Sequence, residues 1–251
     1  RNVLVRDLSI LQGGHFALYA IGCSNLTIDN LTIDTDRDGI DIDCCRDVRI
    51  SNCIVNAPKD DAIVLKSSYG LNRAVVCENV TVTGCKTSGY LMGSVLDGTY
   101  RRSPYIAPDG LGVLGRIKLG TDSVAGFRNV LVTGCLCENS RGLQLGALDG
   151  GTLENVTFSD ITLRDPVNHP LFVRLSPRLR APRGTPVGAV RGVRFSDIAV
   201  SGADGRFPCG IVGIEDAAIR DVTLSGVHVR ASGGGTAEDA ARVPPERRNS
   251  S

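Results

Sequence analysis

Three aspartates in the first quarter of the chain have the residue type and spacing for acid–base chemistry. Asp38 follows a strand-like segment around Leu26, and the adjacent pair Asp60 and Asp61 follows a similar segment around Val48. Ionised carboxyls that lie close together repel each other, so the pKa of at least one of them rises. A protonated carboxyl can then act as an acid while ionised ones activate water, which is the chemistry of hydrolysis. The alternative is that these aspartates only form solvated turns.

A short repeat has to position these carboxyls. Its pattern is a small or polar residue, an aliphatic residue, any residue, an aliphatic residue or Phe, a polar pair, and an apolar residue or Cys. Eight copies begin at Asn2, Asn25, Asp47, Asn79, Asn129, Asn155, Gly192 and Asp221. The alternation of period 2 within each copy predicts β-strands.

The spacing of the copies predicts a parallel β-helix. The closest copies are about 22 residues apart, and a unit this short buries its apolar face only by stacking on its neighbours. The longest step, from Val80 to Val130, holds an insertion and leaves room for an additional degenerate coil. Asp38 lies twelve residues after its anchor and Asp60 twelve after the next. The register therefore predicts that Asp38 stacks on Asp60 at a strand spacing of about 4.8 Å.

Composition limits the domain organisation and the partners. The chain has 251 residues, 42% hydrophobic and 22% charged, with a net charge of +1. This suits one core and argues against nucleic acid or a membrane as a partner. We expect one β-helix domain at residues 1–231 that lacks N-terminal residues, because the chain opens directly on a strand-like segment. Residues 232–251, rich in Gly, Pro and charge, are expected to be a disordered tail.

Seven of the nine cysteines are interpreted as small buried apolar residues. They fall at repeat positions that other copies fill with apolar side chains: Cys23, Cys45, Cys53, Cys77, Cys85, Cys135 and Cys137. Their spacing differs from that of zinc motifs, and the chain has only three His. We therefore expect no metal site. We also expect no cofactor, because carboxyl groups alone can supply the acid and the base.

Three segments resemble, in order, motifs of glycoside hydrolase family 28. They are "DRDGIDID" at 36–43, "KDDAIVLKSS" at 59–68 and "GRIKLGTD" at 115–122. That family includes polygalacturonases and rhamnogalacturonan hydrolases. The resemblance implies an all-β fold, a single-stranded right-handed parallel β-helix of the pectin-lyase-like type. It also implies inverting hydrolysis of α-glycosidic bonds in a pectin-type polysaccharide, by a monomer that is secreted or periplasmic.

The resemblance also implies roles for single residues. Asp60 would be the general acid, and Asp38 and Asp61 would hold and deprotonate the attacking water. Arg116 and Lys118 would bind the carboxylate of a uronic acid.

One family motif is incomplete in this chain. Tyr90 stands near the place where the family has the His of a Gly-His-Gly motif, so Tyr90 is a candidate substrate contact. The difference suggests a divergent, exo-acting member.

Two other function classes stay open. Clustered aspartates could hold Ca²⁺ in a polysaccharide lyase, with Arg116 abstracting the proton. A non-catalytic β-helix that binds glycans is the third interpretation. Further along, Arg174, Arg178 and Arg180 either reach an acidic substrate or are surface charge on a loop.

Overall fold

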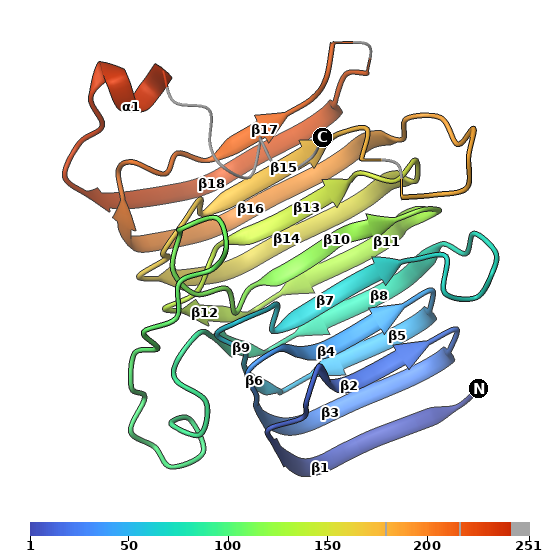
Figure 1. Ribbon diagram of the computed structural model, residues 1–251, viewed down its shortest axis with the longest axis horizontal. Coiled ribbons are helices and arrows are strands. Elements are labelled where there is room, and N and C mark those ends of the chain that lie inside the picture. The colour runs from blue at the N-terminus through green and yellow to red at the C-terminus, as the bar shows by residue number, and fades with distance from the viewer. Residues whose placement is uncertain (179, 216, 242–251) are drawn as a thin grey trace.

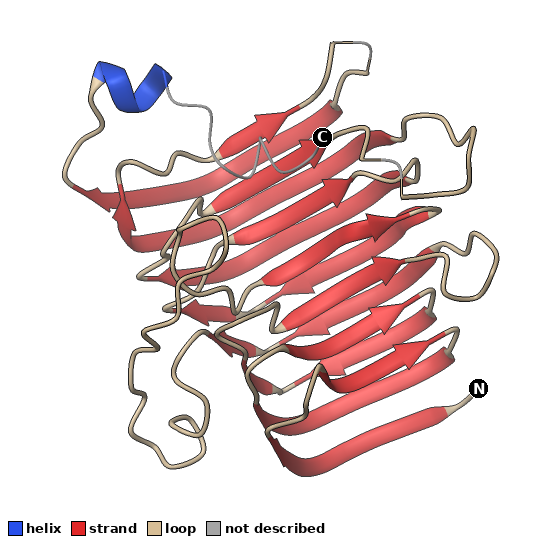
Figure 2. Cartoon of the chain, viewed as in Figure 1, coloured by secondary structure: helices blue, strands red, loops and turns tan. Residues whose placement is uncertain are grey.

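The chain forms a solenoid of parallel strands. A computed structural model describes residues 1–178, 180–215 and 217–241. Two parallel sheets run along the solenoid and face each other (Figure 1), one of 11 strands and one of 7. Within these residues α1 (Ala237–Ala241) is the only helix, and it stands apart from the strands (Figure 2).

Each coil contributes strands to both sheets. The larger sheet contains β1 (Val3–Leu11), β3 (Ser24–Asp34), β5 (Arg46–Ser51), β6 (Ile54–Asn56), β8 (Cys77–Thr83), β9 (Lys86–Ser88), β11 (Gly126–Thr133), β12 (Leu136–Glu138), β14 (Thr152–Arg164), β16 (Ala189–Asp204) and β18 (Arg220–Ser232). The smaller sheet contains β2 (Phe16–Ile21), β4 (Asp38–Asp43), β7 (Ile63–Ser67), β10 (Ile117–Ser123), β13 (Leu143–Ala147), β15 (Leu171–Leu175) and β17 (Gly210–Val212).

The predicted register of the repeat is confirmed along the larger sheet. Val3 pairs with Leu26, Leu26 with Val48 and Val48 with Val80, and the later anchors continue this column to Val222. Val80 pairs directly with Val130, so the longest step is one coil with an insertion and holds no additional coil.

The repeat positions between the sheets form the core. The anchors from Leu26 to Val193 are buried there, and so are six of the seven in-register cysteines, with Cys23 partly buried against them. All nine cysteines are free thiols. The interpretation of the seven in-register cysteines as buried apolar residues is therefore confirmed for six of them, whereas Cys209, which lies outside the repeat register, is exposed.

Two columns of residues in the left-handed backbone region turn each coil. The first position of every copy has a positive φ, and so has the residue five positions later, as Asn25 and Asn30 illustrate. Asn, Asp and Gly adopt this conformation at the least cost, which explains the small or polar residue that opens each copy. The Asn side chains also bond along the column: Asn129 Nδ2 donates to Asn79 Oδ1 at 3.1 Å.

The expected domain and tail stay predictions. β18 ends at Ser232, and α1 follows within the expected tail. Residues 242–251 of that tail lie outside the described residues. Among the described helices, none has the length and apolar character needed to cross a membrane.

Candidate active site

One inserted residue brings the three aspartates together. Asp34 aligns with Asn56 at an offset of 22 residues. In the smaller sheet, by contrast, Ile40 aligns with Ile63 at an offset of 23 residues, so one residue is inserted between Asn56 and Ile63. The register that predicted the stacking of Asp38 on Asp60 therefore shifts by one residue within this segment, and that stacking stays a prediction. The insertion forms a bulge just before β7, in the segment that carries Asp60 and Asp61.

The three carboxyls form one cluster. Oxygen atoms of Asp38, Asp60 and Asp61 all lie within 4.8 Å of one another. The backbone N–H of Asp61 donates to Asp38 Oδ1 at 3.2 Å and to Asp60 Oδ1 at 3.1 Å. A single amide thus fixes the orientation of two carboxyls, because both accept from the same donor.

Asp61 is held as an anion by two cations of the adjacent coil, Arg116 just before β10 and Lys118 within it. Arg116 Nε lies 2.7 Å from Asp61 Oδ1, and Lys118 Nζ lies 2.9 Å from Asp61 Oδ2. Burial would raise the pKa of Asp61, but the charges and hydrogen bonds of Lys118 and Arg116 outweigh it and lower that pKa well below its usual range. Arg116 and Lys118, which were predicted to bind substrate, therefore lie at the site, and both form ion pairs with Asp61.

The pKa of Asp60 is shifted in the opposite direction, upward. Its side chain is 24% exposed, and Arg37 Nη2 lies 2.8 Å from Asp60 Oδ2. Burial, followed by the charges of Asp61 and Asp38, raises the pKa of Asp60 to about 6, although Lys118 and Arg37 oppose this rise. Two adjacent carboxyls thus differ in charge state over a range of mildly acidic pH, as an acid and a water-activating base require.

Lys66 and Asp41 complete the site, and sequence reasoning missed both. Lys66 Nζ lies 2.9 Å from Asp38 Oδ2 and 2.5 Å from Asp41 Oδ2. Asp41 is fully buried, and this burial raises its pKa to about 7, although Lys66 lowers it. The signal was the alternation in "DGIDID" and "IVLKSS", which places Asp41 and Lys66 on the outer face beside the cluster.

A cleft of about 360 Å³ opens beside Asp60. Its floor is the smaller sheet, and its wall comes from the insertion between β9 and β10, which projects from the solenoid in Figure 1. Arg141 fastens this wall, because its guanidinium forms two hydrogen bonds of 2.6 Å to Asp109. Tyr105 of the wall lines the cleft.

Tyr90 lies elsewhere in the insertion. Its backbone N–H donates to Asn56 Oδ1 at 2.7 Å, and its ring packs edge-on against Tyr100. The structure does not place Tyr90 among the residues that line the cleft. Its predicted role as a substrate contact therefore has no positional support.

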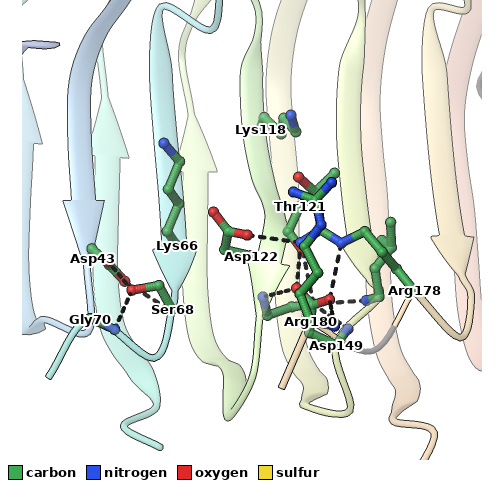
Figure 3. A network of polar contacts seen from close by, with 12 residues as sticks. Asp43, Lys66, Ser68, Gly70, Lys118, Thr121, Asp122, Asp149, Arg178 and Arg180 are labelled. Atoms are coloured by element: carbon green, nitrogen blue, oxygen red, sulfur yellow. Dashed lines mark hydrogen bonds and ion pairs between the residues drawn. The ribbon is translucent and has the colours of Figure 1, made fainter. Parts of the chain in front are cut away.

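The three arginines Arg174, Arg178 and Arg180 differ in their surroundings. Arg178 binds Asp149, which is fully buried, and lies 2.8 Å from Asp122. Figure 3 shows this group, with the backbone N–H of Arg180 donating to Asp149 as well, and a second group in which Asp43 binds Ser68. Arg178 therefore anchors its loop to the solenoid through ion pairs with Asp122 and Asp149. Arg174, on β15, lines the cleft.

The carboxyl cluster has the oxygen ligands that Ca²⁺ prefers, but cationic side chains already bind them. Lys66 binds Asp38, while Arg116 and Lys118 occupy both oxygens of Asp61. A calcium ion would have to displace these cations. Arg116 is also bound to a carboxylate, which suits a fixed positive charge better than the proton acceptor of a lyase.

Known structures share this fold. A family model described as "Right handed beta helix region" matches residues 1–96. The chain is similar to a polygalacturonase from Erwinia carotovora ssp. carotovora, with a TM-score of 0.63 and 14% identity over 92% of this chain and 57% of that one. It is also similar to an endo-xylogalacturonan hydrolase from Aspergillus tubingensis, with a TM-score of 0.59 and 19% identity over 91% of this chain and 61% of that one. No curated protein matches the chain.

These similarities identify the solenoid as a right-handed parallel β-helix, as predicted. The chain spans 57% and 61% of the lengths of the two enzymes. Identities this low define the fold and leave the activity to be argued from the site.

Proposed function

We propose that the protein is a glycoside hydrolase acting on a pectin-type polysaccharide, at galacturonate or rhamnogalacturonan linkages. The observation that carries this proposal is the separation of charge states within the cluster. Asp60, beside the cleft, has a raised pKa, while Asp61, on the adjacent position, is kept ionised by Arg116 and Lys118. A carboxyl pair with this division of roles supplies both the proton and the activated water of glycoside hydrolysis.

The proposed roles follow from the contacts. Asp60 donates its proton to the glycosidic oxygen, because it is the exposed member of the cluster and lines the cleft. Asp38 and Asp61 hold and deprotonate the attacking water. Arg116 and Lys118 keep Asp61 ionised from the buried side, and their proposed contact with a substrate carboxylate would be made from that position.

The stereochemical outcome is a separate part of the proposal. Oxygens of the three carboxyls approach one another within 4.8 Å, so the carboxyls are close, as in retaining enzymes, where the second carboxyl attacks the sugar directly. However, both oxygens of Asp61 already accept bonds from cations, which makes this carboxylate a poor nucleophile. We therefore propose inversion, with water as the attacking group.

Substitution of the acid tests this function. The protein is incubated with polygalacturonate and with rhamnogalacturonan oligomers, with and without a chelator, and NMR follows the anomeric signal of the first product. We expect inverted product, no effect of the chelator, and a rate at least 100-fold lower in Asp60→Asn. An unchanged rate in that variant would contradict the role of Asp60. A retained anomer would contradict inversion, and an unsaturated product lost with chelator would indicate the lyase.

A further inference from the structure

The cleft continues past the aspartates onto the next coil, where Gln144 lies. Gln144 pairs with Lys118 between β13 and β10. Its neighbours Leu143 and Leu145 belong to the core, so Gln144 is on the outer face of the sheet. It is therefore about one strand spacing, 4.8 Å, from the residue whose ammonium binds Asp61.

Gln144 is nearly enclosed, yet part of its amide lacks a partner. The residue is 6% exposed and lines the cleft. Its Oε1 accepts no hydrogen bond from any residue that the structure describes. An enclosed amide oxygen without a bond destabilises a folded chain. A rotation of the amide that turns this oxygen toward the cleft, where a bound group donates to it, is therefore favoured. A sugar hydroxyl fits, because it donates and accepts as an amide does.

The floor beside Gln144 has no room for larger side chains. Gly120 and Gly146 lie on neighbouring strands, and a Cβ on Gly120 would stand 2.6 Å from the carbonyl oxygen of Gly146. Glycine at these two positions keeps the surface of the sheet beside Gln144 free of side chains. Tyr105 provides an aromatic side chain on the wall of the same cleft, which suits the apolar face of a sugar ring.

The charge of the cleft favours an acidic sugar. Cationic side chains outnumber carboxyls in the lining, with Arg37, Lys59, Arg116, Arg141 and Arg174 against Asp60 and Asp109. A cleft with an excess of one charge concentrates ligands of the opposite charge. Arg174 pairs in register with Gly146, so its guanidinium group comes from the strand next to Gln144.

We propose that Gln144 binds a sugar hydroxyl in a second sugar position, one coil beyond the aspartates. The sugar bound there is a uronate residue of the same polysaccharide molecule whose scissile glycosidic bond lies at Asp60. The proposal rests on the proposed function and adds to it the place and the chemical class of a neighbouring sugar.

Binding to an inactive variant tests this position without turnover. Trigalacturonate is titrated into Asp60→Asn and into Asp60→Asn with Gln144→Leu, and calorimetry gives the affinities. We expect Gln144→Leu to weaken binding about 10-fold, the effect of losing one hydrogen bond to the ligand. The melting temperature should be unchanged or higher, because the variant removes an enclosed oxygen without a partner.

The matched control is Thr87→Val in the same background. Thr87 Oγ1 is also buried, beside the Cys137 thiol, but Thr87 lies outside the lining of the cleft. Its substitution should leave the affinity for trigalacturonate unchanged. If Gln144→Leu does not fold, Gln144→Glu replaces it, and the added negative charge should weaken trigalacturonate more than neutral galactotriose.

The outcomes separate this inference from the proposed function. Equal affinity with and without Gln144→Leu would overturn the sugar position even if the wild-type protein hydrolyses polygalacturonate. Failure of every variant to bind trigalacturonate would overturn it as well. Weaker binding in Gln144→Leu, together with a wild-type protein that hydrolyses no pectin oligomer, would support the sugar position and contradict the hydrolase.

Discussion

The charge state of Asp60 determines how the proposed hydrolysis depends on pH. An acid catalyst works while it is protonated, and the pKa of Asp60 is raised to about 6 by burial and by the neighbouring carboxylates. We expect kcat/KM to fall about 10-fold per pH unit above that pKa. Arg37 lowers the pKa of Asp60, so Arg37→Met should raise this pKa and shift the falling limb to higher pH. A pH profile of kcat/KM on oligogalacturonides measures both effects.

If the falling limb of the pH profile of kcat/KM stays in place in Arg37→Met, a group other than Asp60 determines it. Lys59→Met is the matched control, because Lys59 also lines the cleft but binds Asp36, with Nζ 2.6 Å from Asp36 Oδ2. It should leave the limb unchanged.

Lys66 is the residue on which two buried carboxylates depend. Its ammonium binds both Asp38 and Asp41, of which Asp41 is fully buried. Removal of one partner of a buried ion pair leaves an uncompensated charge, so Lys66→Met should lower the free energy of unfolding by about 3–5 kcal/mol. Urea denaturation at pH 8 measures this loss.

The double variant distinguishes charge from packing. Lys66→Met with Asp41→Asn removes one of the two unpaired carboxylates, so it should regain part of the lost stability. A double variant less stable than Lys66→Met would show that the side chain of Lys66 acts mainly through its packing.

At the scale of the strands, the left-handed columns fix the corners of each coil. Asn79 has φ 55°, donates to Asp47 Oδ1 at 2.9 Å and accepts from Asn129. Asn79→Ala places a residue that disfavours this conformation and breaks both bonds, so we expect a loss of about 2–3 kcal/mol in the free energy of unfolding. Asn79→Gly keeps the conformation and should lose less. Urea denaturation of both variants compares them, and equal losses would show that the backbone conformation contributes nothing.

The sequence predicted the strands and their pairing more accurately than the corners between them. The anchor column from Val3 to Val222 matches the predicted register at every step, because apolar periodicity and stacking determine it together. The corner before β7 contains one residue more than the repeat predicted. Corners carry no apolar periodicity, so the repeat pattern contains no information on their length.

At the scale of the whole molecule, residues far apart in the sequence assemble the site. The sequence indicated Asp38, Asp60, Asp61, Arg116 and Lys118, which share one cluster. It did not indicate Lys66, Asp41 or Gln144, whose importance comes from neighbours on adjacent coils. Nor did it show that the insertion places Tyr105 in the cleft and Tyr90 outside it. A side-chain contact across coils follows from three-dimensional stacking, and no local pattern encodes it.

The single inserted residue before β7 has an evolutionary meaning. Between neighbouring coils the offset also changes, from 23 to 22 residues on one side and from 32 to 54 on the other. Here it rises from 22 to 23 in the segment that carries Asp60 and Asp61. A deletion of the Asp60 codon would remove the proposed acid and return this offset to 22 residues without shortening β6 or β7. A catalytic coil and a purely structural coil of this solenoid are therefore one small genetic event apart, so related β-helices can gain or lose this activity while their architecture is unchanged.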